Sequence, residues 1–188
     1  VEKLTSSIMT INSLRGNTKE MILNFFPNEV LKQDGKYKDI KIKFEVDINP
    51  PLGATYEMKY KQLPFNHLVR VYDMPSLFAG KLHAVLCRNW KTRIKGRDLF
   101  DYLFYLKMSS QINMELLRNK LIDSKHLNKD DKFDKEVLHE MLVKRFEDID
   151  FENAKLDVDR FLHKDKSSLD FFKSEIFIQL TDEYFRKM

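Results

Sequence analysis

The segment from Asp73 to Lys107 constrains this chain more than any other part of its sequence. It reads as an apolar helix that contains one lysine, Lys81, followed by a basic loop and a second helix that begins with acidic residues. A charged side chain on an apolar helix face costs free energy unless it is paired. Two carboxylates one helical turn apart repel each other unless a cation lies nearby. The segment carries both costs, and that combination is typical of a site for phosphate or a metal ion.

The composition restricts the classes of function. Of the 188 residues, 33 are Lys or Arg and 29 are Asp or Glu, so a general polyanion binder is excluded and any contact with nucleic acid must come from a local cluster. The one cysteine, Cys87, excludes an internal disulfide and favours the cytoplasm as the location. No apolar run reaches the roughly 18 residues of a membrane-spanning helix, so no membrane partner is expected.

Apolar and charged residues alternate over residues 39–49, which predicts a strand with one apolar and one charged face. Glu45 and Asp47 lie two positions apart on the charged face, so their side chains point the same way. Such a pair can share a divalent cation. The alternative is a solvated strand face on which the two acids simply neighbour Lys41 and Lys43.

The remaining patterns predict an α+β fold, in which a small mixed sheet is followed by a mainly helical bundle. Two short helices are expected before the alternating strand, at residues 2–14 and 18–31. Two further strands are expected after it, at residues 55–63 and 67–72. Asp73 can cap the first helix of the bundle, with Pro75 in its first turn. Later helical patterns cover residues 97–107, 113–123, 131–146, 153–162 and 168–186. We therefore expect two parts, residues 1–72 and a helical domain of residues 73–188.

The basic residues around the second helix are candidates for binding phosphate. Lys81 offers a mobile point charge that suits phosphate, and the alternative is a lysine that extends along the helix edge into water. The sequence from Arg88 to Arg97, RNWKTRIKGR, has five basic residues in ten and no acidic one. Its tryptophan, Trp90, offers a ring on which a base can stack. An ordinary solvated loop explains the same residues without a ligand.

Three charged residues at the start of the helix over residues 97–107 form the sharpest constellation. Arg97 and Asp101 are four apart and can form a surface ion pair, while the helix dipole favours Asp98 in the first turn. These stabilising interactions explain the three residues without any ligand or catalytic role. The histidines show no paired spacing, so no zinc site is expected.

Taken together, these residues resemble a known family. The run from Met74-Pro75 to Lys81, the basic loop, and then Lys95-Gly96-Arg97-Asp98-Leu99-Phe100-Asp101 are similar to the nucleotidyltransferase-like toxins of the AbiEii family, which act in type IV toxin–antitoxin and abortive-infection systems. The family has a helix with a lysine, then a K-x-R-D-x-x-D-like segment that opens the next helix, and an upstream strand that carries a carboxylate. The resemblance covers roughly residues 38–108.

The resemblance implies transfer of a nucleotide from a nucleoside triphosphate, with Mg²⁺, to an RNA or protein acceptor. It implies catalytic roles for Asp47, Lys81, Asp98 and Asp101, and metal binding by Asp47 with Glu45. Lys81 would contact the triphosphate, Asp98 and Asp101 would orient Lys81 or assist at the acceptor, and an antitoxin is a possible partner. The nucleotide would also meet basic side chains of the loop and the helix start, namely Arg93, Lys95 and Arg97.

One part of the family pattern is missing. The glycine turn and the D-x-D pair that hold the catalytic metals do not occur before residue 38. The chain is therefore expected either to be the C-terminal portion of a longer toxin or to have lost its first metal motif.

Two other functions fit the sequence. Asp47 followed by Glu57 and Lys59 loosely matches the D…E-x-K pattern of magnesium-dependent nucleases. Alternatively, the chain is a non-enzymatic helical domain that binds a protein or RNA partner.

Overall fold

The structure, a computed structural model, describes residues 6–7, 13–15, 18–25, 40–90, 94–162 and 167–188. The chain separates into two compact units, Val1–Pro50 and Pro51–Met188. Two small antiparallel sheets and a set of helices confirm the predicted α+β class. The expected functional division after residue 72 stays a prediction.

The first unit contains one antiparallel sheet built around its third strand. The strands are β1 (Ser6–Ser7), β2 (Ser13–Arg15), β3 (Thr18–Phe25) and β4 (Ile40–Asp47). β3 pairs with each of the other three, and its register with β4 runs from Thr18 opposite Asp47 to Phe25 opposite Ile40. The strand predicted over residues 39–49 is therefore confirmed as β4.

The helix expected over residues 18–31 is wrong for its described part, because residues 18–25 form β3. A strand with one apolar face needs a neighbour, and β4 pairs with β3 along its whole length. An ion pair between Lys43 and Glu20, with Nζ 2.8 Å from Oε1, links the two strands. Pairing between distant segments thus overrides the local helical pattern. The described residues of the expected helix over 2–14 are also in strands, β1 and β2.

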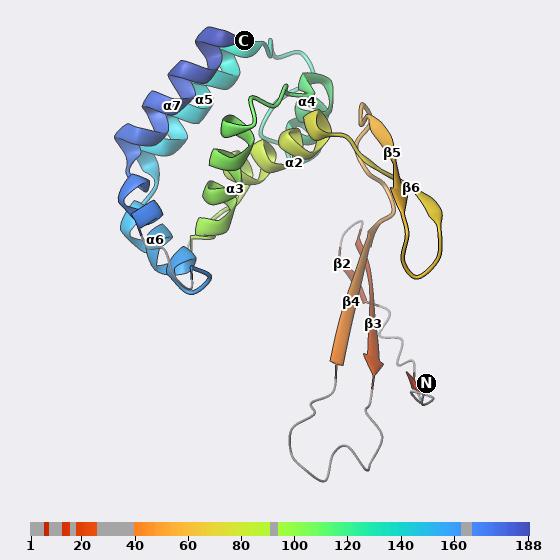
Figure 1. Cartoon of the computed structure of the whole chain (residues 1–188). Helices are drawn as coiled ribbons and strands as arrows, with labels where there is room; N and C mark the ends of the chain where they lie inside the picture. Colours follow the sequence, from red (N-terminus) through yellow and green to blue (C-terminus); the bar gives the residue numbers. More distant parts are fainter. Residues whose placement is uncertain (1–5, 8–12, 16–17, 26–39, 91–93, 163–166) are drawn as a thin grey trace. The chain divides into compact units, whose positions relative to one another are not determined.

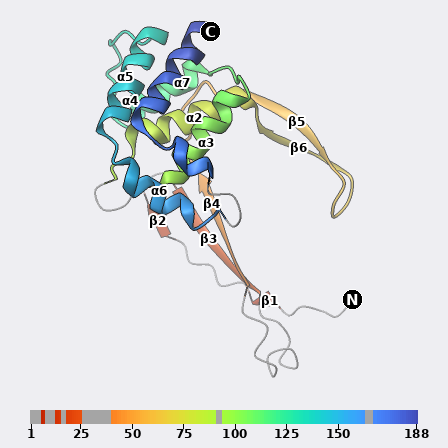
Figure 2. The ribbon, with the colours of Figure 1, turned by 60° about the vertical axis from the view of Figure 1, so that its left-hand side comes forward.

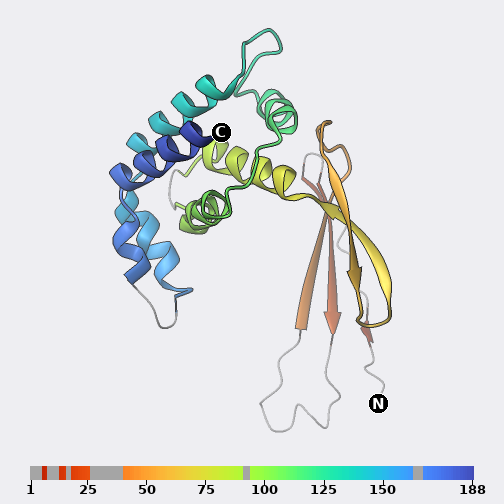
Figure 3. The same cartoon turned by 45° about the horizontal axis from the view of Figure 1, so that its top comes forward.

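The second unit begins with a hairpin of two antiparallel strands, β5 (Tyr56–Lys61) and β6 (His67–Tyr72). Both strands lie where the sequence predicts them. The base of the hairpin is fixed to the first helix, α2 (Met74–Cys87), because Asp73 N donates to Thr55 O and Thr55 N donates to Ser76 Oγ. Figure 3 shows α2 following directly from β6.

Several helices of the second unit begin after a residue whose side chain caps the first turn. After α2 come α3 (Gly96–Lys107), α4 (Met114–Asp123), α5 (Lys135–Asp148), α6 (Phe151–Asp159), the 3₁₀ helix η1 (Ser167–Phe171) and α7 (Ser174–Lys187). Asp73 caps α2 as predicted, by accepting a hydrogen bond from Ser76 N at 3.0 Å. Asp134 accepts from Val137 N, so α5 begins at Lys135 and not at residue 131. The helix expected over residues 168–186 is divided into η1 and α7.

The core of this unit lies between α2 and the helices around it. α2 packs against α3, α4 and α5, while α7 packs against α5 and α3, as Figures 1 and 2 show. Phe78 and Leu82 from α2, Tyr102 from α3 and Phe146 from α5 are completely buried. No helix among the described residues is both long and apolar enough to cross a bilayer.

Gly96 fixes how closely α3 approaches α6. A Cβ atom at this position would lie 2.6 Å from Val158 Cγ2 and closer still to Ala154 O. The first turn of α3 therefore packs directly against α6. This contact fixes the position of the carboxylates that follow Gly96, those of Asp98 and Asp101.

Candidate functional site

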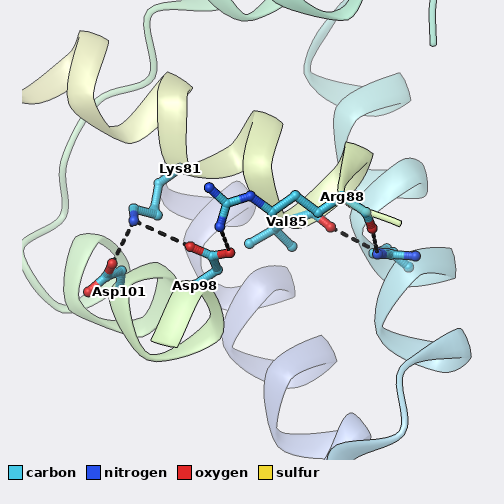
Figure 4. Close-up of polar contacts among 6 residues, drawn as sticks. Lys81, Val85, Arg88, Asp98 and Asp101 are labelled. Carbon is cyan, nitrogen blue, oxygen red and sulfur yellow. Dashed lines mark hydrogen bonds and ion pairs between the residues drawn. The ribbon is translucent and has the colours of Figure 1, made fainter. Parts of the chain in front are cut away.

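The facing surfaces of α2 and α3 bring a lysine and two carboxylates together (Figure 4). Lys81 Nζ lies 2.6 Å from Asp101 Oδ2 and 3.5 Å from Asp98 Oδ1. The two acids are on one face of α3 because they are three residues apart. Three of the residues predicted for the site are thus neighbours in the structure.

Asp98 is the buried centre of this cluster, with only 6% of its side chain exposed. One of its oxygens faces Lys81 and the other accepts from Arg88 Nη1. A buried carboxylate is stable only when cations or donors compensate it, and here two cations do so. The position of Asp98 in the first turn of α3 adds the favourable helix dipole.

Arg88 is held in turn by an arginine from another helix. Arg145 of α5 donates from Nε to Val85 O at 2.9 Å and from Nη2 to Arg88 O at 2.7 Å. Its guanidinium also lies over the Trp90 ring, 4.4 Å from the ring centre. Burial lowers the pKa of Arg145. A cation at the C-terminal end of α2 is favoured by the helix dipole.

Sequence reasoning missed this role of Arg145. It lies 57 residues from Arg88 in the chain, and no local spacing connects the two. Arg145 thus contacts the end of α2. Figure 4 shows how the contacts continue from Arg88 to Asp98 and from Asp98 to Lys81.

Among the described residues, two of the predicted nucleotide-binding residues make no contact with the cluster. A third predicted residue lies outside the described part of the chain. Arg97 is exposed and lies over the Phe161 ring, 4.7 Å from its centre. Lys95 is exposed at the N-cap of α3 and makes no capping hydrogen bond. Arg93 lies outside the described residues.

The carboxylates predicted on the strand lie on β4, in the first unit. Lys43 Nζ is 2.7 Å from Glu45 Oε1, and Asp47 Oδ1 accepts from Asn49 N at 3.1 Å. These contacts match the alternative of a solvated strand face. Because β4 and the α2–α3 cluster belong to different units, a shared site that includes Asp47 stays a prediction.

The described residues do not by themselves make a metal site. Among them, no group of three or more His, Cys, Asp or Glu side chains is placed to hold an ion. Asp98 and Asp101 already face the cations Lys81 and Arg88, which compete with Mg²⁺ for their oxygens. The cluster therefore fits an anion held by Lys81 and Arg88 better than it fits a divalent cation.

A second polar cluster joins α2 to the end of α4, and sequence reasoning did not identify it. Ser124 Oγ is hydrogen-bonded to His83 Nε2 and to His126 Nδ1, at 3.0 Å in each case, and lies 3.8 Å from Cys87 Sγ. Burial lowers the pKa of His83 to about 4, and Lys120 acts in the same direction. His83 is therefore neutral at pH 7.

Comparison with known proteins assigns the family. The family model described as "Nucleotidyl transferase AbiEii toxin, Type IV TA system" matches residues 5–185. The chain belongs to the AbiEii family. Searches of curated proteins and of solved structures gave no match. The AbiEii match extends well beyond the resemblance seen over residues 38–108, and it includes the helices from α4 to α7.

Proposed function

We propose that this chain carries part of the active site of a nucleotidyltransferase toxin, which transfers a nucleotide from a nucleoside triphosphate to an acceptor. The family assignment and the α2–α3 cluster support the proposal. The observation that carries it is the position of the Lys81 ammonium group, which contacts both Asp98 and Asp101. All three residues belong to the segment that resembles the family. In this scheme Lys81 contacts the triphosphate.

The two carboxylates suit different roles because their exposure differs. Asp98 is buried and contacts two cations, so it orients Lys81 and does not face a substrate. Asp101 has 45% of its side chain exposed, and only its Oδ2 contacts Lys81. Asp101 is therefore the proposed base for the acceptor hydroxyl.

The proposed transfer is a single displacement at the α-phosphorus atom. The acceptor oxygen bonds to that atom while the bond to the bridging oxygen breaks, and pyrophosphate leaves with the charge of that oxygen. Asp101 takes the proton of the acceptor hydroxyl. Lys81 compensates the negative charge that grows on the leaving pyrophosphate.

Metal, partners and location rest on the family assignment and on composition. Mg²⁺ in such enzymes neutralises phosphate charge, and Asp47 and Glu45 remain its proposed ligands even though the described residues form no complete site. The acceptor is an RNA or a protein, and an antitoxin is the proposed partner of the system. The cytoplasm is the proposed location, since the lone cysteine suits a reducing compartment.

A direct test incubates the purified protein with labelled nucleoside triphosphates, Mg²⁺ or Mn²⁺, and total RNA. Label transfer by the unchanged protein and its loss in Lys81→Ala are expected. Lys59→Ala on β5 is the control variant, since it is outside the cluster and should transfer normally. Absence of transfer with either metal, together with full toxicity of Lys81→Ala in cells, would count against the proposal.

The nuclease alternative predicts the opposite pattern. Lys59 and Glu57 form an exposed ion pair on β5, with Nζ 3.0 Å from Oε1, and Asp47 lies in the other unit. If RNA is cut and Lys59→Ala abolishes the cleavage, the nuclease alternative replaces the transferase.

A non-enzymatic binding role is favoured by one observation, the uncovered face of the β5–β6 hairpin. Met58, Tyr60 and Leu68 are each about 60% exposed, and aromatic residues with Met are typical of protein interfaces. The discriminating measurement is the melting temperature at saturating nucleoside triphosphate and Mg²⁺, because a ligand of the folded state must raise it. An unchanged value would favour the binding role.

A further inference from the structure

We propose that Arg88 is a second phosphate-binding side chain, which acts with Lys81 across Asp98, and that the pair selects ligands with at least two linked phosphates. The proposal rests on the proposed function, because it concerns the same site. It names the part of the nucleotide that the site recognises, the diphosphate or pyrophosphate portion, and it replaces Arg97 with Arg88 as the second cation.

The first observation is the geometry of the two cations. Lys81 lies on α2, and Arg88 is the residue directly after α2, where the backbone is already extended. Each contacts a different oxygen of Asp98. Figure 4 shows the ammonium and guanidinium groups on either side of this one carboxylate. A ligand with two linked anionic groups can therefore place one group on each cation.

The second observation is the unused hydrogen-bonding capacity of Arg88. A guanidinium has five N–H donors, and its Nη1 contacts Asp98. Within the described part of the chain, its Nε and Nη2 contact no acceptor, and 45% of the side chain is exposed. The planar arrangement of these donors matches two oxygens of a phosphate.

The third observation is that both cations are held in position before a ligand arrives. Asp98 and Asp101 fix the Lys81 ammonium, and Arg145 fixes the backbone carbonyl of Arg88. Groups that are already ordered lose less entropy on binding. The guanidinium of Arg97, in contrast, lies over the Phe161 ring.

The charge balance explains the expected selectivity. Lys81 and Arg88 carry two positive charges, and Asp98 and Asp101 carry two negative charges, so the cluster attracts a single phosphate only weakly. A diphosphate that spans both cations collects charge-assisted hydrogen bonds from each of them. Losing one such contact should weaken binding about 10- to 100-fold.

The test is competition for a fluorescent ATP analogue bound to the complete chain, with pyrophosphate, ADP, AMP and inorganic phosphate as competitors. In the unchanged protein, pyrophosphate and ADP should compete much better than phosphate and AMP. Arg88→Gln should weaken pyrophosphate and ADP about 10- to 100-fold and leave AMP within a factor of about two. Arg160→Gln, which removes an equal charge from the exposed end of α6, is the matched control and should change nothing.

The outcomes separate this inference from the proposed function. If Lys81→Ala loses ATP binding while Arg88→Gln binds pyrophosphate as tightly as the unchanged protein, the Arg88 inference is overturned and the proposed function stands. If the unchanged protein does not bind the ATP analogue, both are overturned. Should Arg88→Gln melt too low for the assay, Arg88→Lys decides, since it keeps the charge and should still lose part of the preference for pyrophosphate over phosphate. The inference is contradicted if each of these two variants that folds keeps the preference of the unchanged protein for pyrophosphate over phosphate.

Discussion

Lys81 Nζ and Asp101 Oδ2 lie 2.6 Å apart although the two residues belong to different helices, α2 and α3. The ion pair joins the only lysine of α2 to an acid that is partly exposed. Asp98, one turn earlier in α3, is buried beside the same lysine. The difference in exposure between the two acids leads to the first of four predictions.

Replacing Asp98 with Asn should destabilise the protein more than replacing Asp101 with Asn. Asp98→Asn leaves Lys81 and Arg88 without their shared buried carboxylate, at a cost of about 1–3 kcal/mol in the free energy of unfolding. Asp101 forms a partly exposed pair, and its loss should cost less than about 1 kcal/mol. Urea unfolding of both variants tests this. Equal losses would show that burial does not distinguish the two acids.

The two glycines of the α2–α3 region should respond to alanine in opposite directions. Gly96→Ala places a methyl group against Ala154 O and Val158 Cγ2, so it should cost about 1–3 kcal/mol in stability. Gly80→Ala meets no atom within 4 Å, so it should stabilise α2 by about 0.5–1 kcal/mol through helix propensity alone. Thermal melting of the pair is the measurement. Destabilisation by Gly80→Ala would contradict the open space observed at that position.

Stability should fall as the pH is lowered from about 6.5 toward 4, partly because of His83. The pKa of His83 is about 4 in the folded protein, below its ordinary value of 6.5, so the unfolded chain binds more protons in this range. The stabilising contribution is present above pH 6.5 and is lost as the pH falls toward 4. Because His83 is only partly buried, we expect about 1–2 kcal/mol after discounting for solvent. The free energy of unfolding at pH 7 and at pH 4.5 measures it.

A variant that cannot titrate serves as the control for His83. Gln at position 83 can still donate a hydrogen bond to Ser124 Oγ but has no pKa in this range. His83→Gln should therefore flatten the loss of stability between the two pH values. The same pH dependence in His83→Gln as in the unchanged protein would assign the effect to other groups.

Arg145→Ala should loosen the C-terminal end of α2. It removes the hydrogen bonds to Val85 O and Arg88 O and the contact with Trp90, at a cost of about 1–3 kcal/mol. Since Trp90 is the only tryptophan in the chain, its fluorescence reports the change directly. We expect a red-shifted emission in Arg145→Ala and a smaller shift in Arg145→Lys. Emission identical to that of the unchanged protein would show that Arg145 does not order this region.

Much of the fold was predictable because local interactions determine it. The alternation that predicts β4 and the Asp73 cap that begins α2 are both read from neighbouring residues, and both are confirmed. Where a distant segment decides, prediction failed. Residues 18–25 form β3 because β4, which is distant in the sequence, needs a paired neighbour. The start of α5 was placed too early for a local reason, since one particular aspartate of its acidic start, Asp134, provides the cap.

For the site, the sequence by itself determined which charged residues the α2–α3 region carries and where the helices that hold them begin. Only the tertiary structure decided how these charges pair. It placed Asp98 between Lys81 and Arg88, and it brought Arg145 to the end of α2. The physical reason is that caps and periodicity act over a few residues, whereas these ion pairs and hydrogen bonds depend on packing that joins residues 10 to 60 positions apart.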